Sequence, residues 1–128
     1  MKLVLDSHAF FWWVVDHPRL TLAARAAIED ADNEVYVSAV VAWEMATKVR
    51  IGKWPDARAI AESFDVAVER SSFLPLAITL QHARVAGFLQ GRHSDPFDRM
   101  LAAQSRIEGM PLVTADPVFK AFGTKVIW

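Results

Sequence analysis

The chain has 128 residues, which is the length of one domain, and 53% of them are hydrophobic while 23% are charged. This composition excludes a disordered or low-complexity chain. The absence of cysteine excludes disulfide scaffolds, thiolate metal sites and a cysteine nucleophile, and the formal net charge of −1 provides no global field to attract nucleic acid or an anionic membrane.

Short β-branched runs alternate along the chain with longer alanine-rich segments. In chain order we expect a strand at Lys2–Leu5, helices at Ser7–Val15 and Leu22–Ala31, a strand at Glu34–Val37, helices from Ala39 to about Arg50 and at Ala57–Arg70, a strand at Phe73–Leu76, helices at Leu80–Gln90 and from Pro96 to the stop at Gly109, a strand at Pro111–Thr114, a short helix at Pro117–Phe122 and a last strand at Lys125–Ile127. Helices between successive strands favour right-handed βαβ units. The sequence therefore predicts an α/β fold, a three-layer α/β/α sandwich around a central parallel sheet of about five strands.

Side chains suited to helix capping support several of these boundaries. The residues concerned are Thr21, Ser38, Asp56, Thr79 and Asp95, and each precedes a predicted helix, as N-cap residues do. A proline interrupts the third predicted strand, where it removes a backbone donor.

Acidic residues follow the predicted strands at the edge of the sheet where ligands bind. Asp6 comes directly after the first strand, and Asp116 follows the fourth by two residues. Asp95 and Asp98 lie at the start of a helix, and Glu44 lies about two turns into the helix that follows the second strand. Because the carboxyl ends of parallel strands meet at one edge, these carboxylates can face one crevice.

Each of these acids also has a purely structural explanation. Three can be helix N-caps, the fourth aspartate can be a first-turn acid favoured by the helix dipole, and Glu44 can form an i,i+4 pair with Lys48. Glu44, however, lies on the same helical stripe as Val40 and Val41, so its carboxylate borders apolar surface and needs a partner. That partner is either Lys48 or a metal ion shared with the aspartates.

Convergence of several carboxylates would restrict the chemistry of the site. Neighbouring carboxylates repel one another and raise one another's pKa values, and a hard divalent cation removes that repulsion. Ligands that are all oxygen suit Mg²⁺ or Mn²⁺ rather than zinc. Such a site serves phosphodiester hydrolysis.

Four segments of the chain, in order, resemble the PIN-domain ribonucleases, specifically the VapC toxins of VapBC toxin–antitoxin pairs. The segments are Leu3–Phe10, Ser38–Lys48, His93–Gln104 and Pro111–Asp116, and the resemblance covers nearly the whole chain. It implies a single PIN domain over residues 1–128. It also implies the toxin component of a type II toxin–antitoxin system, an endoribonuclease that depends on Mg²⁺ or Mn²⁺ and leaves a 5′-phosphate.

The resemblance carries functional roles onto particular residues. The catalytic acids would be Asp6, Glu44, Asp98 and Asp116. Of these, the three aspartates would hold the metal and the glutamate would orient or deprotonate the attacking water. Supporting roles fall to Asp95, Thr114 and Ser7. Lys48 and Arg99, which stand beside the acids in the sequence, are candidates for contacts with RNA phosphates.

The resemblance also implies partners: an RNA substrate, a cognate VapB-type antitoxin and a second copy of the chain. The longest apolar run, Ala9–Val15, is far shorter than the about 20 residues that span a bilayer, so we expect a cytoplasmic protein with no membrane partner. Part of the consecutive aromatic run Phe10–Trp13 is expected in the core, and the remainder at a dimer or antitoxin face.

Two other functions remain open on sequence alone. A catalytically inactive PIN-like module would bind partners without cleaving RNA. A receiver-like signalling module would need an acidic pair after the first strand and an aspartate after the third, whereas Asp6 stands alone and no acid follows Phe73–Leu76 directly.

Overall fold

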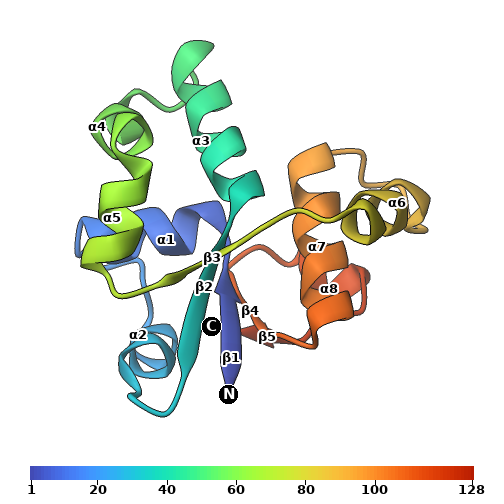
Figure 1. The fold of residues 1–128 in the computed structure, drawn as a ribbon, viewed down its shortest axis with the longest axis horizontal. Coiled ribbons are helices and arrows are strands. Elements are labelled where there is room, and N and C mark those ends of the chain that lie inside the picture. The colour runs from blue at the N-terminus through green and yellow to red at the C-terminus, as the bar shows by residue number, and fades with distance from the viewer.

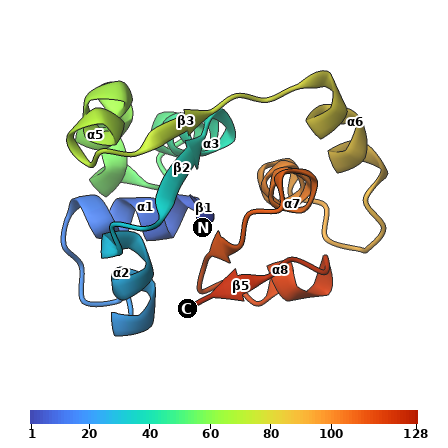
Figure 2. The ribbon, with the colours of Figure 1, turned by 60° about the horizontal axis from the view of Figure 1, so that its bottom comes forward.

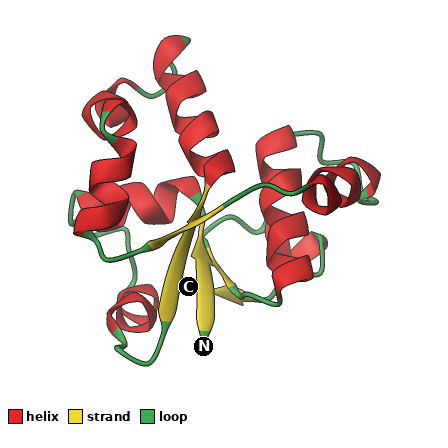
Figure 3. Ribbon diagram, viewed as in Figure 1, coloured by secondary structure: helices red, strands yellow, loops and turns green.

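The computed structural model describes residues 1–128 and contains one parallel sheet whose strands run in the order β3-β2-β1-β4-β5. The strands are β1 (Lys2–Leu5), β2 (Glu34–Ser38), β3 (Leu74–Leu76), β4 (Leu112–Val113) and β5 (Val126–Ile127). The helices are α1 (Ser7–Val14), α2 (Leu22–Glu29), α3 (Ala39–Arg50), α4 (Arg58–Glu62), α5 (Phe64–Arg70), α6 (Leu80–Phe88), α7 (Pro96–Glu108) and α8 (Val118–Ala121), with a 3-10 turn, η1 (Pro55–Ala57), before α4. Figure 3 shows the strands at the centre and the helices around them.

Helices cover both faces of the sheet (Figures 1 and 2). α1, α2, α4 and α5 lie on one side and α6, α7 and α8 on the other, while α3 rises beyond the carboxyl ends of the strands at the top of Figure 1. The predicted three-layer α/β/α sandwich with a five-stranded parallel sheet is confirmed. The chain builds outward from β1 through β2 to β3 and then crosses to β4, so the strand order reverses between β1 and β4. In such sheets this reversal opens a crevice beyond the carboxyl ends of the strands.

The two strands that flank the reversal are the most buried part of the sheet. Leu3–Leu5 of β1 and Leu112–Val113 of β4 are fully buried, and Leu5 lies opposite Val113 in the parallel register. Burial on both faces explains why these strands are continuous apolar runs in the sequence. Each side chain of this size contributes about 1.5–3 kcal/mol on burial. The acids that follow the two strands therefore start from a rigid base.

The proline in the third strand is accommodated because β3 lies at an edge of the sheet. Pro75 pairs in register with Val37 of β2, and β3 has no further strand on its other side. A missing backbone donor is tolerated at such an edge.

The segment Ala57–Arg70 differs from its prediction as one helix capped by Asp56. It divides into η1, α4 and α5, with a break at Ser63, where φ is −124° and ψ is 40°. Asp56 lies inside η1 and caps nothing, while the turn at Ser63 lets the ring of Phe64 pack 5.0 Å from that of Phe10. Tertiary packing has here overridden local helix propensity. None of the helices is both long enough and apolar enough to cross a membrane.

Candidate active site

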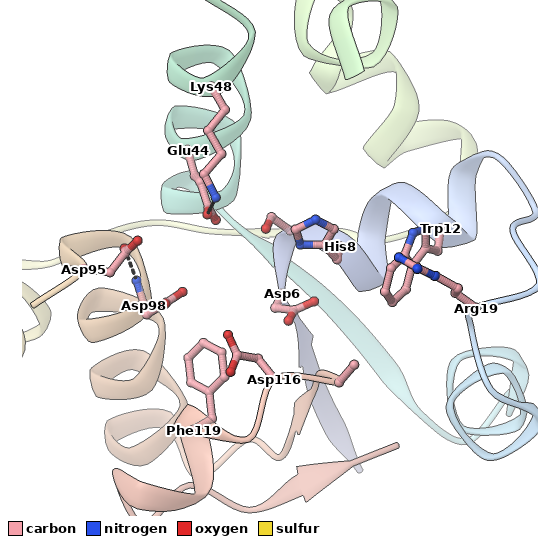
Figure 4. Close-up of a pocket in the computed structure, with 12 residues that line it drawn as sticks. Asp6, His8, Trp12, Arg19, Glu44, Lys48, Asp95, Asp98, Asp116 and Phe119 are labelled. Atoms are coloured by element: carbon pink, nitrogen blue, oxygen red, sulfur yellow. Dashed lines mark hydrogen bonds and ion pairs between the residues drawn. The ribbon is translucent and has the colours of Figure 1, made fainter. Parts of the chain in front are cut away.

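A cleft of about 280 Å³ opens beyond the carboxyl ends of the strands, where the strand order reverses (Figure 4). Its lining comes from the end of β1, from α1 and the loop after it, from α3, from the start of α7, from the turn after β4 and from α8. The lining residues are Asp6, Ser7, His8, Trp12, Arg19, Glu44, Lys48, Asp95, Asp98, Ala115, Asp116 and Phe119. Five acidic side chains thus share one cleft with two basic ones, as the strand-end argument predicts.

Asp6 lies at the bottom of this cleft and is almost fully buried. Its Oδ1 atom accepts a hydrogen bond of 2.8 Å from the backbone nitrogen of Ala9, which caps α1, and its Oδ2 atom accepts one from the hydroxyl of Thr114. Burial, with a smaller contribution from the charges of Glu44 and Asp98, raises the pKa of Asp6 to about 7 despite these hydrogen bonds. A carboxylate in this position is costly unless a cation joins it.

Asp98 faces Asp6 from the first turn of α7 (Figure 4). Its Oδ2 atom lies 2.7 Å from Nε2 of His93. Burial raises the pKa of Asp98 despite that contact, and the charges of Asp95 and Glu44 add to the effect. Two carboxyl groups of the cleft therefore have raised pKa values for the same physical reasons.

Asp95 begins α7 as its N-cap, as predicted. Its Oδ1 atom accepts hydrogen bonds from the backbone nitrogens of Phe97 and Asp98, at 2.8 Å and 3.1 Å. The proline at the first helical position needs no donor there, which suits this start. Asp95 thus sets the direction in which α7 presents Asp98.

Glu44 is buried on α3 and has a partner in Lys48. The lysine Nζ atom donates to Oε2 of Glu44 at 2.6 Å. Of the two partners that the sequence left open for Glu44, the structure therefore contains the lysine. Desolvation acts to lower the pKa of Lys48, but the hydrogen bond and charge of Glu44, with the charges of Asp95 and Asp98, raise it overall. Lys48 therefore stays cationic inside the cleft.

Asp116 reaches the cleft from the turn after β4, and a single hydroxyl ties it to Asp6. Thr114 Oγ1 donates to Asp6 and accepts a 3.0 Å hydrogen bond from the backbone nitrogen of Asp116. The Asp116 Oδ1 atom accepts a 3.0 Å hydrogen bond from the nitrogen of Val118 at the start of α8. Ser7 is buried beside Asp6 and lines the same cleft.

Arg99 is the candidate that the structure does not bring to the cleft. Its guanidinium donates to the carbonyl oxygens of Ala86 at 3.1 Å, His93 at 2.9 Å and Leu89. It thereby ties the loop before α7 to that helix. Successive helical residues point about 100° apart, so Arg99 cannot share the direction of Asp98, and adjacency in the sequence was misleading.

Sequence reasoning missed four residues that line the cleft: Trp12, Arg19, Ala115 and Phe119. His8, two residues after Asp6, also lines the cleft, and its pKa is lowered first by partial burial and then by the charge of Lys48. The spacing of His8 and Trp12, four residues apart on α1, would have placed them on one helix face. No pattern in the sequence signals Arg19.

The donor set of the cleft fits a hard divalent cation by its chemistry. Every acidic ligand offers oxygen, and the cleft has room for a hydrated ion. The pKa values of Asp6 and Asp98 are raised by burial and then by neighbouring acidic charges, both of which a bound cation would offset. As the side chains lie, no three acidic or histidine groups are close enough to hold an ion directly. Binding would therefore draw side chains inward or use water as a bridge, as Mg²⁺ commonly does.

Comparison with known proteins agrees with the fold. The family model for the PIN domain matches residues 3–125. Ribonuclease VapC22 of Mycobacterium tuberculosis is 31% identical over 125 residues, which cover 89% of this chain and 86% of that protein. Ribonuclease VapC16 of the same organism is 34% identical over 70 residues, covering 52% of this chain and 50% of that protein. The chain belongs to the PIN domain family, and the predicted resemblance to its VapC members is confirmed.

Solved structures share the fold across nearly the whole chain. VapBC2 from Rickettsia felis, bound to a DNA fragment from the promoter, matches with a TM-score of 0.68 and 17% identity, covering 98% of this chain and 97% of that chain. VapBC-1 from nontypeable Haemophilus influenzae matches with a TM-score of 0.67 and 18% identity, covering 98% and 96%.

Proposed function

We propose that the chain is the toxin component of a type II toxin–antitoxin system and hydrolyses phosphodiester bonds of RNA with Mg²⁺ or Mn²⁺. The observation that carries this proposal is the convergence of Asp6, Glu44, Asp98 and Asp116, from four separate segments, in one cleft. Burial, together with neighbouring acidic charges, raises the pKa values of Asp6 and Asp98 there. The relatives named as VapC ribonucleases support the same activity.

In this proposal the four acids divide between two roles, binding of the metal ion and activation of the water. Asp6, Asp98 and Asp116 hold the divalent ion, directly or through water. When bound, the ion supplies a Lewis acid for the phosphate and lowers the pKa of water. Glu44 orients the attacking water or accepts its proton, and Lys48, which is paired with that carboxylate, stands ready to contact a phosphate oxygen.

The remaining residues position these acids. Thr114 holds Asp6 and the backbone of Asp116 on one hydroxyl, Asp95 starts α7, and Ser7 packs beside Asp6. None of the three needs to touch the substrate. Their substitution should weaken activity less than loss of an acid that holds the metal.

We also propose a VapB-type antitoxin as a partner and a homodimer as the free toxin. Support for the antitoxin comes from the similar folds, which were solved as VapBC assemblies. Charge supports it as well, because an acidic cleft attracts a basic segment of an inhibitor. A cytoplasmic location accords with an RNA substrate.

Cleavage of total RNA, with the product ends mapped, tests the proposed activity. Wild type should cleave with Mg²⁺ or Mn²⁺ and leave 5′-phosphates, and EDTA should stop it. Asp98→Asn should lose cleavage by at least about 100-fold with the fold intact by circular dichroism. Glu62→Gln, in an exposed ion pair with Arg58, is the matched control and should cleave as wild type.

Two outcomes would overturn the proposal. Full activity of Asp98→Asn would show that the reaction does not use this cleft. RNA or antitoxin binding by the wild type without any metal-dependent cleavage would favour the inactive PIN-like module instead.

A further inference from the structure

One wall of the acidic cleft is built of aromatic rings rather than acids. The imidazole of His8 stacks on the indole of Trp54, with ring centroids 4.5 Å apart and planes at 22°, and lies 5.4 Å from the ring of Trp12. His8 is exposed and lines the cleft, so the part of its ring that Trp54 does not cover meets solvent there. Figure 4 shows His8 and Trp12 on the side of the cleft away from Asp95.

The same wall carries a positive charge that has no partner in the chain. The guanidinium of Arg19 lies 5.9 Å from the ring of Trp12, and Arg19 makes no ion pair, although it lines a cleft with five acids. The other cation of the cleft, Lys48, is already held by Glu44. Arg19 is thus the one cationic side chain of the cleft that is free to bind an anion.

A second arginine shows what a purely structural contact of this kind looks like. Arg25 lies 5.8 Å from the ring of Trp13, much as Arg19 lies over Trp12, but it also pairs with Asp16 at 2.9 Å and stands outside the cleft. The two arginines share the stacking geometry and differ in whether the charge is satisfied. Only the arginine at the cleft remains available for an anionic ligand.

We propose that His8 and Arg19 form a nucleotide subsite, in which His8 stacks on an unpaired base beside the cleaved bond and Arg19 binds an adjacent phosphate. This inference rests on the proposed RNA cleavage and assigns two residues to holding the RNA beside the cleaved bond. A base in a duplex is already stacked and cannot reach an aromatic platform, whereas a splayed base can. Trp54 and Trp12 hold the imidazole in place. Arg19 also offsets the repulsion between the acids and the phosphate backbone.

The competing occupant of this wall is a protein, either an antitoxin or a second copy. The position of the wall favours RNA, because His8 stands two residues after Asp6 in the same cleft and a substrate held at the acids must pass over it. A protein could also cover the wall. A wall that served only to bind a protein would give the chain no preference for single-stranded over duplex RNA. That difference makes the two occupants separable by experiment.

Binding of a fluorescently labelled 12-nucleotide RNA tests the subsite. Measurements use fluorescence anisotropy in Mg²⁺, with every protein also carrying Asp98→Asn so that cleavage is prevented. The parent should bind the single strand at least about 10-fold more tightly than the same sequence in a duplex. His8→Ala should lose about 10-fold in affinity for the single strand, the scale of one stacked base, and His8→Phe should restore most of it.

The arginine is tested by the salt dependence of the same binding. Arg19→Gln should weaken binding about 5-fold and reduce the slope of log K against log salt concentration by about 0.7, the amount for one phosphate contact on a single strand. The matched controls are Arg25→Gln, for a stacked but paired arginine, and Phe88→Ala, for an exposed aromatic ring on α6. Both should bind as the parent does.

Cleavage by the same variants, now without Asp98→Asn, separates this inference from the proposed function. Changes at His8 and Arg19 should raise KM and leave kcat within about twofold. If wild type cleaves RNA while both variants match the controls in binding and KM, the subsite is wrong and the function stands. If wild type does not cleave but binding follows the expected pattern, the function is wrong and the subsite stands. Equal loss with His8→Phe and His8→Ala, or equal binding of single strand and duplex, overturns the stacking of an unpaired base.

Discussion

Two regions of the molecule that hold buried polar groups differ in whether those groups have partners. Between α6 and α7, the ring of His82 donates from Nε2 to Glu108 at 2.8 Å and accepts at Nδ1 from the backbone of Thr79 at 3.1 Å. Gln104 donates to the carbonyl of Ala77 at 3.3 Å, and its Oε1 atom accepts a hydrogen bond from the hydroxyl of Ser38. In this network, which we call the α6–α7 network, each polar side chain has found its partners.

The acidic cleft lacks such closure. Asp6 and Asp98 have raised pKa values because burial and like charges outweigh their hydrogen bonds, and Arg19 remains unpaired. A closed network stabilises the fold, whereas a cleft with unmatched charges is poised for ligands that supply the missing charge. The comparison teaches that the state of the charges, rather than burial as such, distinguishes the functional region from the structural one.

The largest expected effect concerns activity, and it contrasts one acid from each region. Asp116→Asn should reduce Mg²⁺-dependent RNA cleavage by at least about 100-fold, because it removes a proposed ligand of the ion. Glu108→Gln should leave the cleavage rate within about twofold, because its partner is His82 and it lies outside the cleft. Initial cleavage rates at saturating Mg²⁺ measure both. Comparable losses in the two variants would erase the distinction between the regions.

The next effect concerns stability, and here substitution in the α6–α7 network should have the large effect. His82→Leu leaves Glu108 and the backbone of Thr79 without their partner, so it should lower the free energy of unfolding by about 2–4 kcal/mol, or the Tm by roughly 5–15 °C. Urea denaturation gives the free energy, and Glu62→Gln should change it by less than about 0.5 kcal/mol. A His82→Leu variant as stable as wild type would show that the α6–α7 network is not structural.

A smaller effect depends on pH and belongs to the cleft. Folding raises the pKa of Asp6 from 3.8 to about 7, so the folded state binds the proton more tightly. The contribution of this group is fully present below about pH 4 and is lost as pH rises through about 7. The free energy of unfolding of Asp6→Asn, measured in EDTA, should therefore exceed that of wild type by about 1–3 kcal/mol at pH 8. This difference should vanish at pH 4. A variant less stable than wild type at pH 8 would mean that the ionised carboxylate is well compensated.

Much of the fold and the acid set could be predicted from the sequence. Continuous apolar strands, capping residues and their spacing gave the parallel sheet, with most element ends within two residues of the structure. The rule that ligands bind at the carboxyl ends of strands placed Asp6 and Asp116 together, and the positions of Glu44 and Asp98 in the helices that follow strands brought them to the same edge.

The remainder depended on tertiary geometry that local patterns do not carry. The break at Ser63 follows packing of the segment against the core. Arg99 is drawn to three carbonyls at the end of α6 and in the loop that follows it, whose course no motif specifies. Arg19 reaches the cleft because the chain turns after α1, where Asp16 has a φ of 53°, a conformation that non-glycine residues seldom adopt. Contacts set by such turns are visible only in the structure.

The central claim is that the acidic cleft binds a divalent ion, and calorimetric titration with Mn²⁺ at pH 7 tests it most directly. Wild type should show saturable binding with release of protons, detected by repeating the titration in buffers of different ionisation enthalpy, because Asp6 with a pKa of about 7 is partly protonated before the ion arrives. Asp98→Asn should bind at least about 10-fold more weakly, and Glu108→Gln should bind as wild type does. Binding that is undiminished in Asp98→Asn, or no binding by the wild type, would contradict the account.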